Sequence, residues 1–160
     1  MSQAFIERVS LGNLYVARID AAEDLHGAIS RIADLKSERR MLILSAVGAL
    51  CDVSLRNLAP GAELPIEGSH WLPLTEPGPC EIVSLSGDLF PMSGEPVLHL
   101  HASLGTSSGV VVGGHLDSAT VFSSVEIFMV AIDGSWTVRK PDTQTGLAEL
   151  TIATESRHGH

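Results

Sequence analysis

The sequence predicts an α+β domain built on a mainly antiparallel β-sheet with one principal amphipathic helix. A single stretch places apolar residues at helical spacing, whereas most other apolar runs have the length and alternation of strands. Aromatic residues make up only 4% of the chain, so Val, Leu, Ile and Ala must fill the core, which suits strands. Runs of strands beside one helix are typical of an α+β domain rather than of alternating βαβ units.

The first elements expected are a strand over residues 13–19 and a helix over about 21–37. Asp20 is the predicted N-cap, and Glu23 can complete a capping box three residues later. Basic side chains at the far end suit the negative end of the helix dipole. One helical face is apolar and should meet the core: Leu25, Ala28, Ile29, Ile32, Ala33 and Leu35.

The rest of the chain is expected to be strands and loops. Residues 41–46 and 50–58 are expected to form two strands or one strongly bent strand, and residues 59–79 a proline-rich loop with a short edge strand at 70–72. Further strands are expected at 81–85, 97–104, 110–117, 121–132, 136–139 and 147–153, with turns at 86–88, 105–109 and 133–134. The 160 residues are assigned to a single domain, with a core over about 14–152 and a loose tail at 154–160.

Charge and composition exclude several classes of protein. The formal net charge is −9 and no basic patch is evident, so direct nucleic-acid binding is not expected. The sequence shows no signal peptide and no apolar stretch long enough for a membrane span, which predicts a cytoplasmic protein. Cys51 and Cys80 lie far apart without a CxxC spacing and are expected to be buried, reduced thiols.

Three histidines carry the strongest functional signal. His99 and His101 are two residues apart in a predicted strand, so their side chains leave the same face. A hairpin loop of three or five residues places His115 opposite one of them on that face, and the glycine after a small polar turn favours three. Gly113-Gly114 indicates either a bulge that re-aims His115 or close backbone packing.

Three neutral imidazoles with an open fourth position are a common zinc site, although nickel, copper and iron(II) also accept imidazole. A lone His-x-His pair is more often two ordinary half-buried histidines; the third, in-phase histidine favours the metal site. Glu81, Asp117 and Glu126 are candidates for an outer-shell carboxylate or a general base. The remaining histidines are expected to be solvated: His26, His70, His158 and His160.

Several segments together resemble the PPC family, the plant and prokaryote conserved domain that follows AT-hook motifs in plants. The matching segments are Ala22-Glu23-Asp24-Leu25, Val47-Gly48-Ala49-Leu50, Glu81-Ile82-Val83-Ser84-Leu85-Ser86-Gly87, His99-Leu100-His101 and Val112-Gly113-Gly114-His115-Leu116. The resemblance implies an α+β fold, a homotrimer, and metal ligation by His99, His101 and His115. The resemblance does not imply that this chain binds DNA directly, because the chain lacks the Arg-Gly-Arg-Pro core of an AT-hook. The plant Gly-Arg-Phe-Glu-Ile-Leu motif appears as Gly78-Pro79-Cys80-Glu81-Ile82-Val83, without the Arg and Phe of the plant-type partner site.

Two functions follow from these observations. The first is a trimeric metal-binding protein, with zinc the preferred ion, whose open coordination position takes a small ligand. The alternative is a non-catalytic oligomeric interaction module that is DNA-associated through partners and has a structural metal or none. No nucleophile constellation, phosphate loop or dinucleotide fingerprint is present, so the sequence does not decide whether the protein is an enzyme.

Overall fold

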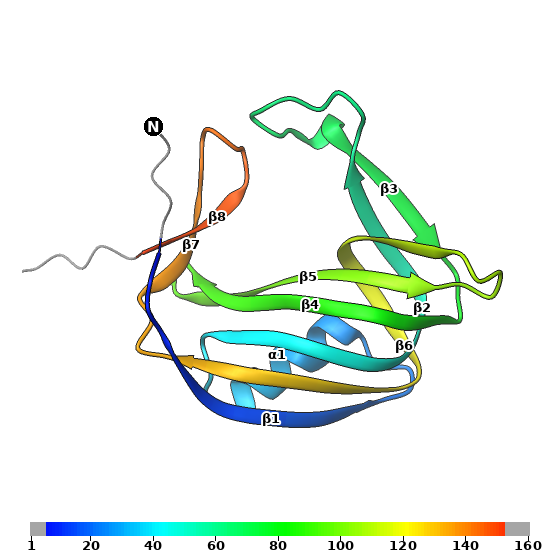
Figure 1. The fold of residues 1–160 in the computed structure, drawn as a ribbon, viewed down its shortest axis with the longest axis horizontal. Coiled ribbons are helices and arrows are strands. Elements are labelled where there is room, and N and C mark those ends of the chain that lie inside the picture. The colour runs from blue at the N-terminus through cyan, green and yellow to red at the C-terminus, as the bar shows by residue number, and fades with distance from the viewer. Residues whose placement is uncertain (1–5, 153–160) are drawn as a thin grey trace, which may run out of the picture.

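The computed structural model describes residues 6–152 (Figure 1). The elements follow the expected order of one helix among eight strands, with a short 3-10 turn, η1. Their bounds are β1 Ser10–Asp20, α1 Leu25–Leu35, β2 Met41–Leu58, η1 Gly68–His70, β3 Trp71–Glu76, β4 Cys80–Met92, β5 Glu95–Gly105, β6 Val111–Asp133, β7 Thr137–Pro141 and β8 Ala148–Ile152.

The strands form one sheet that curls back on itself. Its order is β3-β2-β6-β5-β4-β7-β8, with β1 added on β6 and a further pairing between β2 and β4. The pairings β2–β6, β6–β5, β5–β4 and β4–β2 therefore close a ring, which removes exposed edges from the middle of the sheet. All pairings are antiparallel except the contact of β4 with β7. The predicted α+β fold is confirmed.

The core lies inside this curled sheet and is completed by α1. Leu25, Ile29 and Ala33 are fully buried along one face of the helix, as the helical spacing predicted. Leu35, which was expected on the same face, is instead 81% exposed, because it is the last residue of the helix. Aliphatic side chains from the strands fill the rest, among them Met41, Leu50, Leu85, Leu89, Leu100, Leu104, Val125, Ile127 and Met129. Alternate residues of β5 thus point into the core, and the residues between them point outward.

The helix is shorter than predicted because its N-cap is Asp24 rather than Asp20. The Asp24 Oδ2 accepts a hydrogen bond from the Gly27 amide at 2.6 Å. Asp20 instead remains in β1, paired with Ser124 of β6. Glu23 forms an ion pair with Arg31, so the capping box expected at Asp20 is wrong. Asp20 and Asp24 are both suitable N-cap residues. Because Asp20 pairs with β6 as part of β1, the helix begins after Asp24.

Several predicted breaks are bends in long strands. Residues 41–58 form one strand, which is the second of the two alternatives predicted for them, and residues 111–133 form another, with register shifts along their pairing. The predicted turn at 86–88 is wrong, because β4 continues through it to Met92. A Cβ on Gly87 would collide with the carbonyl oxygen of His99 in β5, so this glycine permits close strand pairing and does not form a turn.

Two arms rise from the same side of β4 and β5 (Figure 1). One is the β2–β3 hairpin, which includes the edge strand predicted near 70–72, and the other is the β7–β8 hairpin. The arms meet where the Ile66 amide donates to the Thr145 carbonyl at 2.7 Å. The outward face of β5 therefore lies beneath an arch.

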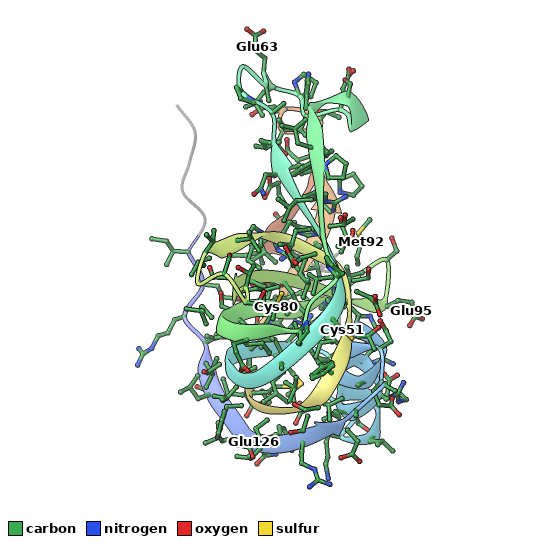
Figure 2. The ribbon with its side chains drawn as sticks, turned by 90° about the vertical axis from the view of Figure 1, so that its right-hand side faces the viewer. Cys51, Glu63, Cys80, Met92, Glu95 and Glu126 are labelled. Atoms are coloured by element: carbon green, nitrogen blue, oxygen red, sulfur yellow. The ribbon has the colours of Figure 1, made fainter. Side chains whose placement is uncertain are left out.

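Cys80 is buried and Cys51 half-buried, and both are free thiols, in line with the prediction of reduced cysteines (Figure 2). Among residues 6–152, no helix has the length and apolar character needed to span a membrane. The tail predicted at 154–160 lies outside the described residues.

Candidate metal centre

The β5–β6 hairpin brings His99, His101 and His115 onto one surface. His101 lies directly opposite His115 in the register. The Thr106 amide donates to the Val110 carbonyl at 2.9 Å, and Gly109 has a φ of +81°. Only three residues separate this closing pair, and a left-handed glycine ends the loop, as the turn residues predicted.

The three imidazoles converge. Ring centroids are 5.1 Å apart for His99–His101, 5.0 Å for His99–His115 and 5.4 Å for His101–His115. One candidate ligand nitrogen from each ring lies within 4.8 Å of the other two. Leu100, Ala102 and Leu104, between and beyond the histidines of β5, point into the core and fix the rotation of the strand.

Gly113 and Gly114 serve close packing rather than a bulge. The β5–β6 register runs unbroken from His101↔His115 to Gly105↔Val111. A Cβ at Gly113 would lie 2.7 Å from the Ala102 carbonyl oxygen, and one at Gly114 would lie 2.6 Å from the Asn57 side chain. The glycines therefore let β6 approach both neighbouring strands just before His115.

His99 is positioned by a pair of charged residues. Asp88 lies opposite His99 in β4, and Arg139 reaches the same point from β7. The Arg139 Nη2 lies 2.7 and 2.9 Å from the two Asp88 oxygens and 2.9 Å from His99 Nδ1. The Arg139 side chain is only 8% exposed, and its Nη1 donates to the Ala148 carbonyl at 2.9 Å.

His115 has a matching pair. The Arg56 Nη2 lies 3.0 Å from His115 Nε2, and the Arg56 Nε lies 3.3 Å from Asp117 Oδ1. The same Asp117 oxygen is 3.7 Å from His115 Nε2. The Arg56 guanidinium also lies over the ring of Trp71, 4.8 Å from its centroid.

These surroundings keep two of the histidines neutral. Burial lowers the pKa of His115 to about 4, with a further contribution from the positive charge of Arg56. Burial, followed by Arg139, lowers the pKa of His99 as well. Guanidinium groups can only donate, so the ring nitrogen that faces each arginine carries the lone pair, and a metal ion bound at that nitrogen would replace the arginine contact. Neutral imidazole is the form that binds metal ions.

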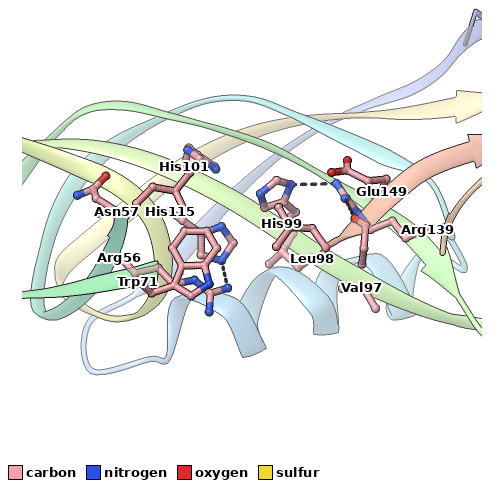
Figure 3. A pocket seen from close by; sticks show the side chains of 13 residues that line it. Arg56, Asn57, Trp71, Val97, Leu98, His99, His101, His115, Arg139 and Glu149 are labelled. Atoms are coloured by element: carbon pink, nitrogen blue, oxygen red, sulfur yellow. Dashed lines mark hydrogen bonds between the residues drawn. The ribbon is translucent and has the colours of Figure 1, made fainter. Parts of the chain in front are cut away.

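The histidines form part of a pocket of about 560 Å³ beneath the arch (Figure 3). Arg56 and Trp71 stand on one side, Arg139 and Glu149 on the other, with the histidines between them. Apolar side chains complete the lining: Leu58, Val97, Leu98, Leu147 and Ala148. This volume is in the range of small-molecule sites.

Of the three predicted carboxylates, only Asp117 is placed beside a triad histidine by a contact in the structure. Glu81 is exposed and pairs with Gly105 at the far end of β5. Glu126 is eleven residues beyond His115 in β6 and lies at the opposite end of the molecule from Glu63 (Figure 2). Neither belongs to the pocket lining, so the structure gives them no role there.

Sequence reasoning missed Asp88, Arg56, Arg139, Trp71 and Glu149. Asp88 had been placed in a turn, although its position in a continued β4 would have put it opposite His99. His26, expected to be exposed, is half-buried against β6, and no partner among the described residues bonds its Nδ1. His70 belongs to η1, where its Nδ1 accepts from the Glu67 amide.

The donor set fits a divalent transition metal. Three imidazole nitrogens on a tetrahedral zinc ion are about 3.4 Å apart, given a Zn–N distance of about 2.1 Å. The candidate nitrogens lie within 4.8 Å of one another on adjacent strands, so small side-chain rotations suffice to bring them together. Asp88 accepts from Arg139 Nη2, which also contacts His99 Nδ1, so this carboxylate acts on the His99 ring through the arginine.

Comparisons with known proteins agree with this architecture. The family model of the Plants and Prokaryotes Conserved (PCC) domain matches residues 7–133. The structure of a plant- and prokaryote-conserved protein from Pyrococcus horikoshii has a TM-score of 0.77 at 28% identity, covering 93% of this chain and 100% of that one. A metal-containing protein from Archaeoglobus fulgidus gives 0.81 at 30% identity, covering 92% and 99%.

Among curated relatives, the bifunctional protein GlmU of a Synechococcus strain is 31% identical over 140 residues. The match covers 87% of this chain and 20% of that protein, so the chain spans about a fifth of the length of the curated relatives it matches.

Proposed function

This chain belongs to the Plants and Prokaryotes Conserved (PCC) domain family, and from that premise we propose that it is an oligomeric metal-binding protein. His99, His101 and His115 hold one divalent transition metal, preferentially zinc, and the remaining coordination positions are open to a small ligand. The observation that carries the proposal is the convergence of three imidazoles on the floor of a pocket of about 560 Å³.

Zinc at such a site acts as a Lewis acid toward an oxygen ligand in its open position. Around it, Arg139 and Arg56 contact the rings of His99 and His115 and are themselves paired with Asp88 and Asp117, and apolar side chains line much of the pocket. The metal-containing relative from Archaeoglobus fulgidus supports metal binding as a property of this architecture. The two free cysteines support a reducing, cytoplasmic location.

We further propose a homotrimer, supported by apolar side chains on the outer face of the sheet. Leu14 and Val16 on β1 are 63% and 67% exposed. Val47 on β2 and Phe122 on β6 are also more than half exposed and point outward. Exposed apolar patches of this kind mark surfaces that are covered in an assembly.

The alternative is an interaction module that is associated with DNA only through partners. In that case the metal would be structural or absent and would not bind a small ligand. In either case we expect no tight duplex binding by this chain alone, because its net charge is −9. Micromolar duplex affinity that falls steeply with added salt would contradict that expectation.

Metal analysis of untagged protein tests the metal site. Wild-type protein dialysed against zinc is expected to retain one ion per chain, and His101→Ala is expected to retain little, because two imidazoles are a poor site. The matched control is the double variant His158→Ala/His160→Ala, which removes two histidines outside the triad and should keep the ion. Equal zinc content in His101→Ala and wild type would refute the proposal, provided that circular dichroism shows both folded.

A further inference from the structure

The two arginines beside the triad differ in how many of their donors remain free. Arg139 is buried, and its Nη1 and Nη2 donate to Ala148, Asp88 and His99. The Arg56 side chain is 38% exposed and lines the pocket. Its Nη2 contacts His115, and within residues 6–152 no acceptor is bonded to its Nη1. Arg56 thus offers unused donors beside the histidines.

The ring of Trp71 packs against the Arg56 guanidinium. Trp71 pairs with Leu58 across the β2–β3 arm, and its ring lies 4.8 Å from the guanidinium carbon. A planar guanidinium that is already stacked loses little freedom when it binds a planar, two-oxygen group. Carboxylate matches that geometry with two parallel hydrogen bonds.

The charges around the site favour a ligand with a single negative charge. Arg56 and Arg139 stand near three carboxylates, those of Asp88, Asp117 and Glu149, so the charges of these five groups sum to −1. A divalent ion raises the sum to +1, and one carboxylate then neutralises it. A doubly charged phosphate monoester would return the site to −1, and burial of net charge is costly.

The rest of the lining is apolar and suits a hydrocarbon body. Leu58 and Val97 are exposed in the free chain and face the pocket, as do Leu98 and Leu147. Resting on the metal-binding function above, we propose that Arg56 binds the carboxylate of a small apolar monocarboxylic acid beside the three-histidine site. The hydrocarbon body packs between the two arms, against Leu58, Val97 and Leu147.

Calorimetry with simple probes tests this assignment. Zinc uptake by wild-type protein is measured first, and benzoate is then titrated into the zinc-loaded and the metal-free protein. Benzoate is expected to bind the zinc-loaded protein at least about tenfold more tightly than the metal-free protein, because the metal-free site has a net negative charge. It should also bind more tightly than uncharged benzamide and doubly charged phenyl phosphate.

Substitution of Arg56 separates its role from that of the metal. With both proteins saturated with zinc, as checked by metal analysis, Arg56→Gln is expected to weaken benzoate binding by at least about tenfold, the loss typical of a charge-assisted pair. Arg56→Lys keeps the positive charge beside Asp117 and should weaken benzoate binding severalfold. If Arg56→Gln folds poorly, the benzoate affinity of Arg56→Lys serves as the readout. The control is Arg18→Gln, which removes an exposed arginine on β1 that pairs with Asp20.

The outcomes distinguish the two proposals. Zinc uptake without benzoate binding overturns the carboxylate site alone, as do benzamide or phenyl phosphate binding as tightly as benzoate, and unchanged affinity in both Arg56 variants. Absence of zinc uptake by the wild type overturns the proposed metal-binding function and the carboxylate site with it.

Discussion

The Asp88–Arg139 pair is expected to be the strongest electrostatic contact that holds the β7–β8 arm to the sheet. The side chains are 16% and 8% exposed, and Arg139 Nη2 lies 2.7 Å from Asp88 Oδ1. Removing one partner leaves the other charge buried, which costs about 3–5 kcal/mol. Asp88 keeps some contact with water, so we take the lower end and expect Arg139→Met to lose about 3 kcal/mol of stability.

The same reasoning predicts the behaviour of a double variant. Asp88→Asn alone should also cost about 3 kcal/mol, because it strands the Arg139 guanidinium. The combined Asp88→Asn/Arg139→Met variant should be no less stable than either single variant, which corresponds to a coupling energy of about 3 kcal/mol. Each single substitution should lower Tm by about 6–12 °C, at about 2–4 °C per kcal/mol for a chain of this size.

The measurement is thermal unfolding followed by circular dichroism, with a chelator present so that bound metal does not contribute. All variants are compared at one protein concentration, because assembly adds to apparent stability. Additive losses in the double variant would refute the reasoning, because they would mean that the two charges do not stabilise each other in the folded chain.

The other predictions concern pH and assembly. The pKa of His115 is lowered from 6.5 to about 4 in the folded chain, so the unfolded chain binds a proton first as the solution is acidified. Metal-free protein should therefore lose stability as pH falls from 6.5 to 4, and His115→Gln should remove part of that slope in urea titrations; equal slopes would contradict this. Light scattering should report a trimer that Val16→Glu disrupts, while Leu35→Glu, an equally drastic change at the exposed end of α1, leaves it intact. A wild type that is monomeric at all concentrations would disprove the trimer.

The histidine triad was predictable because everything it needs lies in one hairpin. Strand periodicity places His99 and His101 on one face, and loop length decides the side of His115. The arginine–aspartate pairs were not predictable, because they join β2 to β6, and β7 to β4 and β5, over long distances in sequence. Finding Asp88 required knowing that β4 continues past Gly87, and that depends on how closely β5 packs against it.

All three histidines lie within one β-hairpin, so the metal ligands can come together without contacts from distant parts of the chain. His99 and His115 are sixteen positions apart, so bringing them together before the sheet exists costs about 3 kcal/mol of chain entropy, less than a contact between more distant strands. Any affinity of the ion for these histidines in the unfolded chain would make its stabilisation of the native state smaller than its native affinity implies. Arg56 and Arg139 reach the hairpin only when distant strands pair. We therefore expect the arginines that contact a small-molecule ligand to take their places after the three histidines have come together.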